Sequence, residues 1–173
     1  EFTGGINMSL KAKLEAKIDA WRPRTVKLLK QHGATKISDV TIAQAIGGAR
    51  GVRCLVTDIS YLDPNEGIRF RGYTIPETLE KLPKVPGHDM PYVEGHIYLL
   101  LTGDIPTDDD VQDVVAELKK RCHVPQYVKD VLRAMPRDTH PMTMFSAALL
   151  SMQRESKYVQ AYNKGLGKMD HWQ

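Results

Sequence analysis

Apolar residues recur three or four positions apart along most of the chain, and this spacing constrains the fold more than any other feature. Leu10, Leu14, Ile18 and Trp21 open the series. Residues at this spacing lie on one face of a helix, so the stretch predicts an amphipathic helix. With 173 residues and 42% apolar content, the chain is long enough to bury a core. The pattern therefore predicts a mainly helical, all-α fold.

Local boundary signals divide this pattern into separate helices. Pro23 predicts a break, because proline has no N–H to donate within a helix. Thr74 and Glu77 have the spacing of a capping box, and Gly103 is expected to end a helix in the left-handed conformation. We also expect a second helix ending near Gly33, a short helix over 40–46 and helices over 91–101 and 128–135. Thr107 is expected to cap a helix, and another helix is expected to start at His140-Pro141. The last helix is expected to run through Tyr158 and Met169 without a stop signal.

Residues 52–73 depart from the helical spacing. The apolar positions with a two-residue period are Val52, Cys54, Val56, Ile68 and Phe70. Residues 63–67 between them are rich in turn-forming types. We therefore expect a small β excursion here, with Arg69 and Arg71 on the face opposite Ile68 and Phe70.

Composition excludes several classes of protein. The net charge is +3 with the two signs interspersed, which argues against a nucleic-acid-binding face. No run approaches the roughly 18 apolar residues of a membrane helix. Cys54 and Cys122 are expected to be reduced thiols. Residues 1–7 have no recognisable targeting signal and are expected to be a cloning-derived or disordered leader, with 8–173 forming an incomplete helical domain.

The sequence contains no recognisable catalytic or metal-binding motif. Its six histidines lack zinc-site spacing, and no Gly-x-Ser-x-Gly elbow is present, so we expect no catalytic residue and no metal site. Residues 47–51 form a glycine-rich loop in which Arg50 could bind an anion. A tight loop with a solvated arginine is the competing interpretation. Asp108–Asp110 are expected to stabilise the positive end of a helix.

The stretch Met142–Met152 is apolar on nearly all sides of the expected helix. Such a helix is buried on more than one side. We therefore expect it to pack at a subunit interface or against neighbouring helices.

Residues Leu62–Pro76, LDPNEGIRFRGYTIP, resemble the LDP-EGIRFRGYSIPE segment of eukaryotic, mitochondrial-type citrate synthases. The loop at 47–51 resembles the family's GGMRG loop. The strings Leu101–Thr107, His140-Pro141-Met142 and Arg154-Glu155-Ser156 continue the likeness, which covers roughly residues 10–173. On this resemblance the chain corresponds to the N-terminal part of the family's large helical domain.

The resemblance implies a homodimer and a mitochondrial matrix enzyme of the tricarboxylic acid cycle. The family condenses acetyl-CoA with oxaloacetate and water to citrate and CoA, with no tightly bound cofactor. It implies that the helix containing Met142–Met152 lies at the dimer interface. The family's catalytic motifs are not matched, so the chain alone is expected to be inactive. A 2-methylcitrate synthase portion and a non-catalytic dimerisation module are the alternatives. Neither nucleic acid nor a membrane is an expected partner.

Two cations are the candidate binding residues that the resemblance supplies. Arg50 matches the loop arginine that lies near the CoA phosphates in the family. Lys168 stands where animal enzymes carry an arginine that reaches CoA from the partner subunit. Lysine keeps the charge but loses the bidentate geometry of arginine. For both residues, a solvated surface cation is the competing interpretation.

Overall fold

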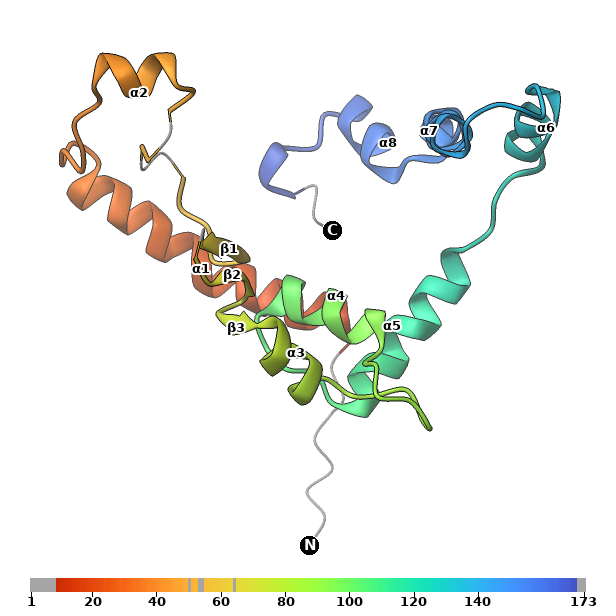
Figure 1. Cartoon of the computed structure of the whole chain (residues 1–173), viewed down its shortest axis with the longest axis horizontal. Coiled ribbons are helices and arrows are strands. Elements are labelled where there is room, and N and C mark those ends of the chain that lie inside the picture. Colours follow the sequence, from red (N-terminus) through yellow and green to blue (C-terminus); the bar gives the residue numbers. More distant parts are fainter. Residues whose placement is uncertain (1–8, 50, 53–54, 64, 171–173) are drawn as a thin grey trace, which may run out of the picture. The chain divides into compact units, whose positions relative to one another are not determined.

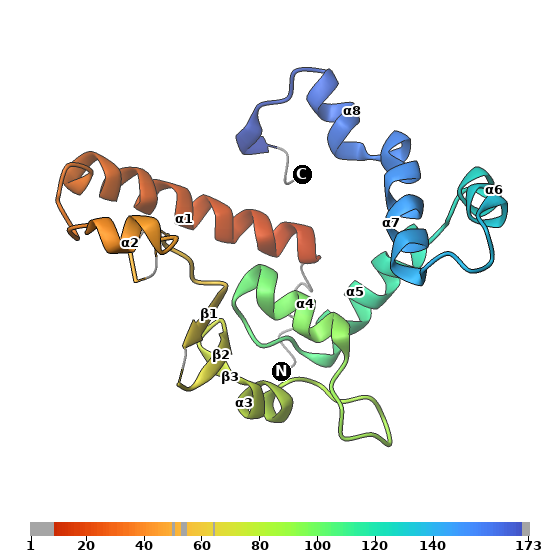
Figure 2. The ribbon, with the colours of Figure 1, turned by 45° about the horizontal axis from the view of Figure 1, so that its top comes forward.

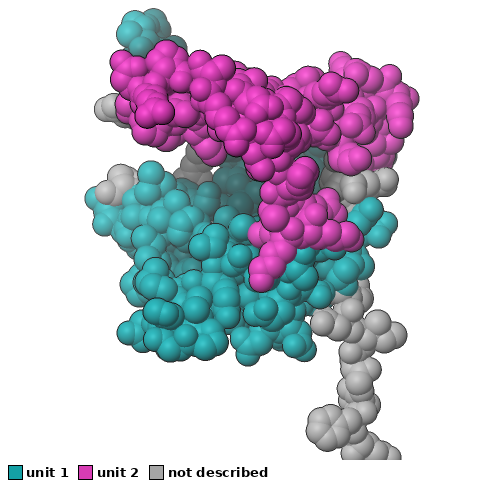
Figure 3. Space-filling view, turned by 90° about the vertical axis from the view of Figure 1, so that its right-hand side faces the viewer, with its two compact units in different colours: residues 1–117 teal, residues 118–173 magenta. Residues whose placement is uncertain are grey.

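The computed structural model describes residues 9–49, 51–52, 55–63 and 65–170, except for the side chain of Lys168. The chain divides into two compact units, residues 1–117 and 118–173, which Figure 3 shows in separate colours. Helices dominate both units (Figures 1 and 2), which confirms the mainly α prediction.

The first unit contains five helices, counting the one that continues past residue 117, and a small sheet within its described residues. They are α1 (Leu10–His32), α2 (Ile42–Ile46), β1 (Ser60–Asp63), β2 (Gly67–Phe70), β3 (Tyr73–Thr74), α3 (Ile75–Lys81), α4 (Val93–Thr102) and α5 (Asp108–Arg121). In the second unit, the described residues after α5 form α6 (Gln126–Ala134), α7 (Pro141–Ser151), η1 (Met152–Glu155), α8 (Lys157–Asn163) and η2 (Lys168–Asp170).

The predicted break at Pro23 is wrong, because α1 continues through it as one helix of 23 residues. Proline already has a backbone torsion close to the helical value, and it removes a single donor. The residues before and after Pro23 stay helical, so the loss of this one donor does not end the helix. Ser9 starts the helix by accepting a hydrogen bond from Ala12 N–H at 3.4 Å, and α1 then packs against α4.

The β excursion exists, but it begins later than expected. Three antiparallel strands pair in the order β1-β2-β3, with Tyr61 opposite Arg69 and Phe70 opposite Tyr73. Val52 and Val56 lie outside the strands, and Cys54 lies outside the described residues. The turn after β1 is fixed by Asp63, whose Oδ1 accepts from the N–H groups of Asn65 and Glu66 at 2.8 and 3.0 Å.

The predicted faces of this sheet are partly wrong. Phe70 contacts the ring of His96 on α4 edge-on, with centroids 4.6 Å apart. Arg71 was expected on the opposite face, but its guanidinium binds the C-terminal end of the same helix. The physical reason is that Arg71 has left β2 and adopts a positive φ of 49°, which breaks the alternation of a strand.

The core of the first unit centres on α4. Its buried apolar side chains are Leu82, Tyr98, Leu99, Val111 and Val114. Gly95 lets α5 approach α4 closely, because a Cβ at Gly95 would lie 3.3 Å from Cγ2 of Val111. Leu99 and Val111 are fully buried, so the packing of α4 on α5 excludes water.

The predicted helix boundaries around this core are confirmed. Thr74 and Glu77 form the capping box, with Thr74 N–H donating to the Glu77 carboxylate at 2.8 Å. Gly103 ends α4 with a φ of 81°. Thr107 Oγ1 accepts from Asp110 N–H at 3.2 Å and so caps α5. Each contact satisfies a backbone group that a helix end leaves without an intrahelical partner.

In the second unit, α6 packs against α7, with Val128 fully buried. His140 caps α7, since its Nδ1 accepts from Met142 N–H at 3.2 Å, and Pro141 occupies the first turn. The prediction of a last helix running past Met169 is wrong. α8 ends at Asn163, because Gly165 adopts a left-handed φ of 79°, and a separate short helix, η2, follows.

Candidate functional site

Neither predicted CoA-binding cation can be placed by its side chain. Arg50 lies outside the described residues. The backbone of Lys168 begins η2, and its side chain lies outside the described part of the chain. Both assignments therefore stay predictions.

The backbone on either side of Arg50 forms the predicted tight loop. Gly48, Ala49 and Gly51 have positive φ values of 77°, 60° and 73°. Ala49 N–H donates to Gln44 O at 2.8 Å, which ties the loop to α2, and Val52 N–H donates to Ala49 O at 3.0 Å within the loop. Glycine adopts such torsions with little strain, so Gly48 and Gly51 allow the chain to turn here.

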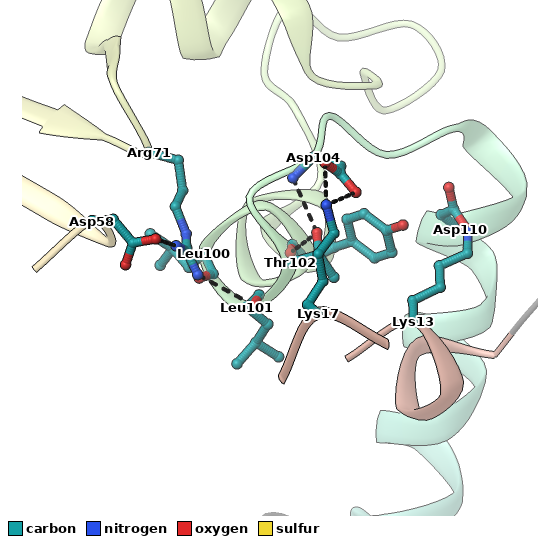
Figure 4. Close-up of polar contacts among 10 residues, drawn as sticks. Lys13, Lys17, Asp58, Arg71, Leu100, Leu101, Thr102, Asp104 and Asp110 are labelled. Atoms are coloured by element: carbon teal, nitrogen blue, oxygen red, sulfur yellow. Dashed lines mark hydrogen bonds and ion pairs between the residues drawn. The ribbon is translucent and has the colours of Figure 1, made fainter. Parts of the chain in front are cut away.

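Two ion pairs join α1 to the region around α5 (Figure 4). Lys13 binds the carboxylate of Asp110, and Lys17 binds that of Asp104 at 2.8 Å. The Lys17 pair is exposed, whereas the side chain of Asp110 is only 7% exposed. A buried carboxylate is costly unless it is paired and hydrogen-bonded, so the Lys13 pair constrains the position of α1 more than the Lys17 pair does.

Asp110 has two further donors. Its Oδ2 accepts from the backbone N–H of Thr107 at 3.0 Å and from the Thr107 hydroxyl at 2.9 Å. Burial disfavours the charged carboxylate, but the hydrogen bonds from Lys13 and Thr107 outweigh burial and lower the pKa of Asp110 below its ordinary value of 3.8. The same contact raises the pKa of Lys13. Asp110 is therefore a structural carboxylate held in its charged form.

Arg71 binds the C-terminal end of α4 and the segment that precedes β1. Its Nε and Nη2 donate to Leu100 O at 2.9 and 2.7 Å, and Nη1 pairs with Asp58 at 2.8 Å (Figure 4). Its backbone N–H donates to Ile59 O at 2.8 Å. A cation at a helix C-terminus satisfies carbonyls and complements the helix dipole.

A cavity of about 180 Å³ lies beside this arginine. It is lined by Leu14, Lys17, Ile18, Trp21, Asp58, Ile59, Arg71, Leu101 and Thr102. Both of its cations, Lys17 and Arg71, are already paired with carboxylates. The lining thus offers apolar surface and neutralised charges.

The helix α7 contains no buried residue in this chain. Phe145 is 57% exposed and Leu150 is 77% exposed, and Met142 and Leu149 are also exposed. Ser146 and Ser151 satisfy their hydroxyls within the helix, by donating to the carbonyls four residues earlier. An exposed apolar surface of this kind is typical of a protein–protein or helix–helix contact.

Two of the histidines that the structure describes have structural contacts. His140 caps α7 and His96 packs against Phe70, as given above. Among the described residues, no group of three His, Cys, Asp or Glu side chains could hold a metal ion. No helix in the described ranges is both long and apolar enough to span a bilayer.

The helices and the β1–β2 hairpin, which carries the LDPNEGIRFRGY string, define a mainly helical protein with a small antiparallel sheet. A sequence model described as "Citrate synthase, C-terminal domain" matches residues 48–171. The chain belongs to the citrate synthase family.

Individual relatives support the assignment to this family. The chain is 46% identical over 171 residues to the protein named "Citrate synthase, mitochondrial" of Aspergillus niger, covering 99% of this chain and 36% of that protein. It is 42% identical to its Saccharomyces cerevisiae namesake with the same coverage. It is 44% identical over 146 residues to "Citrate synthase, peroxisomal" of Saccharomyces cerevisiae, covering 84% of this chain and 32% of that protein. The chain thus spans about a third of the length of these relatives.

The ion pairs of this region were missed by sequence reasoning. Lys13 and Asp110 are 97 positions apart, and Arg71 is 29 positions from Leu100. No local period or motif connects residues at such separations. The run Asp108–Asp110 was interpreted only as helix N-terminal charge, which is correct for its place in α5 but does not distinguish Asp110 from its neighbours.

We expect Asp110→Asn to lower the free energy of unfolding by about 1 kcal/mol near neutral pH, because it removes the charged partner of Lys13. The folded-state pKa of Asp110 is below 3.8. Its contribution is therefore fully present above about pH 4 and is lost as pH falls through the folded value. Denaturant titrations between pH 2 and 6 measure this, and the variant should show a shallower loss of stability on acidification.

Asp109→Asn is the matched control, since Asp109 is an exposed carboxylate in the same first turn of α5. Equal pH profiles for the two variants would contradict the special role of Asp110.

Proposed function

We propose that this chain is part of a citrate synthase, which condenses acetyl-CoA with oxaloacetate and water to give citrate and CoA. The observation that supports this most is identity of 42–46% extending over 99% of the chain. The tight loop around Arg50 and the hairpin that carries the LDPNEGIRFRGY string are consistent with it.

In this proposal the chain contributes scaffold and substrate contacts. Arg50, with Lys168 contributed by a partner subunit, contacts the CoA phosphates, since Arg and Lys form charge-assisted hydrogen bonds with phosphate. The proton transfers belong to a carboxylate that takes the methyl proton and to histidines that polarise the enol and keto oxygens. Those groups come from parts of the protein outside these 173 residues.

The partner that we propose for α7 is the same helix of a second copy. A two-fold contact brings one surface against itself, so a self-complementary apolar helix is suitable. The exposed Phe145 and Leu149 would be covered in that dimer. The names of most relatives above favour a mitochondrial matrix location over a peroxisomal one.

The 173-residue chain alone should release no CoA from acetyl-CoA and oxaloacetate, because it lacks the acid–base groups. The full-length protein should do so. Spectrophotometric detection of the free CoA thiol measures both. Turnover by the isolated chain would contradict the proposed division of roles, and a full-length protein that prefers propionyl-CoA would point to 2-methylcitrate synthesis.

In the full-length protein, Arg50→Ala should raise KM for acetyl-CoA about tenfold with little change in KM for oxaloacetate, as expected when one charged phosphate contact is lost. The KM of Arg50→Lys for acetyl-CoA should lie between those of the unchanged protein and Arg50→Ala, because the charge remains but the bidentate geometry is lost. Lys36→Ala is the control, since Lys36 is an exposed cation paired with Asp39. An unchanged KM in Arg50→Ala would refute the assignment.

The isolated chain should self-associate through α7, and Phe145→Glu should shift it towards monomer by placing a charge in the apolar contact. Sedimentation velocity over a range of concentrations measures this. Val26→Glu is the control, because Val26 is a comparably exposed apolar residue on α1. A wild-type chain that stays monomeric, or equal effects of the two variants, would contradict the role of α7.

A further inference from the structure

The second half of α1 extends beyond the part that packs on α4. Every residue from 23 to 41 is exposed, whereas Leu14 and Ile18 on the first half are partly buried. In Figure 2, the end of α1 that leads into α2 lies well away from α4. The described part of the first unit therefore covers only the first half of this helix.

An apolar face continues along the uncovered half of α1. Trp21 lies three residues after Ile18, at helical spacing. Leu28 and Leu29 follow Trp21 by seven and eight residues, so they lie on the same face of the helix. Trp21, Leu28 and Leu29 are 46%, 58% and 64% exposed. Exposed apolar surface rimmed by polar residues marks a site of contact with another surface.

The cavity beside Arg71 lies at the point where the cover by α4 ends. Trp21 lines it from α1 and Leu101 lines it from the last turn of α4, and Leu101 is itself 42% exposed. Its volume is about 180 Å³. An apolar cavity of roughly 150 Å³ holds a benzene molecule. One bulky apolar side chain of a partner can therefore enter this cavity beside Trp21.

Cations lie along another side of the second half of α1. Arg24, Lys27 and Lys30 succeed one another at a spacing of three residues, which makes them neighbours on the helix surface. Residues 20–38 contain no Asp or Glu. Among the described residues, no ion pair is recorded for these three cations, whereas Lys17 on the first half is paired. This half of the helix therefore presents uncompensated positive charge beside its apolar face.

We propose that the second half of α1 binds an acidic amphipathic helix supplied by the part of the protein outside these 173 residues. The chain spans about a third of the length of its relatives, so most of the protein lies outside it. This rests on the proposed function, because a longer citrate synthase supplies the helix.

A helix fits this surface because α4 already packs on the first half of α1 in the same way. The apolar stripe of the partner helix covers Trp21, Leu28 and Leu29, and one of its bulky side chains fills the cavity. Its carboxylates lie opposite Arg24 and Lys27, since surfaces in contact carry complementary charge.

Hydrogen exchange of the backbone N–H groups in residues 21–32 should be at least about tenfold slower in the full-length protein than in the 173-residue chain, because the partner helix restricts local opening. Leu28→Asp should make this exchange about tenfold faster in the full-length protein, since a charge then enters the apolar contact. In the 173-residue chain, where Leu28 is exposed, the same change should alter exchange by less than about twofold. Ala20→Asp is the matched control, because Ala20 is an exposed residue of the same helix outside the apolar face.

The acidic character of the partner is tested by charge reversal. Lys27→Glu combined with Lys30→Glu should make exchange of residues 21–32 about fivefold faster in the full-length protein at low salt, because like charges then meet across the contact. The effect should shrink at about 0.5 M NaCl, where screening is stronger. Lys11→Glu combined with Lys84→Glu is the control, since both lysines are exposed and lie outside the second half of α1. Equal effects of the two double variants would overturn the acidic partner.

Equal exchange of residues 21–32 in the full-length protein and in the 173-residue chain would overturn the proposal. Protection that appears in the 173-residue chain as its concentration rises would also overturn it, by assigning the face to a second copy. So would protection that requires added vesicles of phosphatidylcholine with phosphatidylglycerol, which would assign the face to a membrane. If any of these outcomes occurs while the full-length protein releases CoA, this inference fails alone. If residues 21–32 are protected as expected but no CoA is released, the proposed function fails and the helix contact stands.

Discussion

The C-terminal end of α4 sets the constraint on which the first unit depends. A helix end presents carbonyls that need donors. Gly103 turns the chain away, and the guanidinium of Arg71 supplies donors to Leu100 and Leu101. The hairpin is thereby fixed to α4, α1 packs on the same helix, and Gly95 allows α5 to close over it. An arginine in a strained turn thus links the sheet to the helical core.

Much of this arrangement could be predicted from sequence, because the relevant signals are local. The capping boxes at Thr74 and Thr107, the glycine at 103 and the His140-Pro141 start all depend on residues within a few positions. The failures also have physical causes. Pro23 was judged by its missing donor alone, while a long helix tolerates that loss. The end of α8 was missed because Gly165 was not given weight as a left-handed residue.

Less of the candidate binding site than of the fold could be predicted from the sequence. The two cations came from the family likeness, and their side chains lie outside the part of the chain that the structure describes. The ion pairs that the structure records in the first unit, Arg71 with Asp58 and Lys13 with Asp110, join residues from different elements. Pairing between distant residues has no periodic signature, so it becomes visible only when the elements are placed together. The apolar character of α7, by contrast, was evident from sequence and agrees with its exposed side chains.

Pro23 gives α1 a consequence beyond its shape. Helix formation is cooperative because each added residue extends a continuous series of donors, and proline interrupts that series. The part of α1 before Pro23 is tethered by the ion pairs of Lys13 and Lys17, whereas the part after it is exposed. We therefore expect the exposed part of α1 after Pro23 to open locally at a lower free-energy cost than the part that the ion pairs of Lys13 and Lys17 hold.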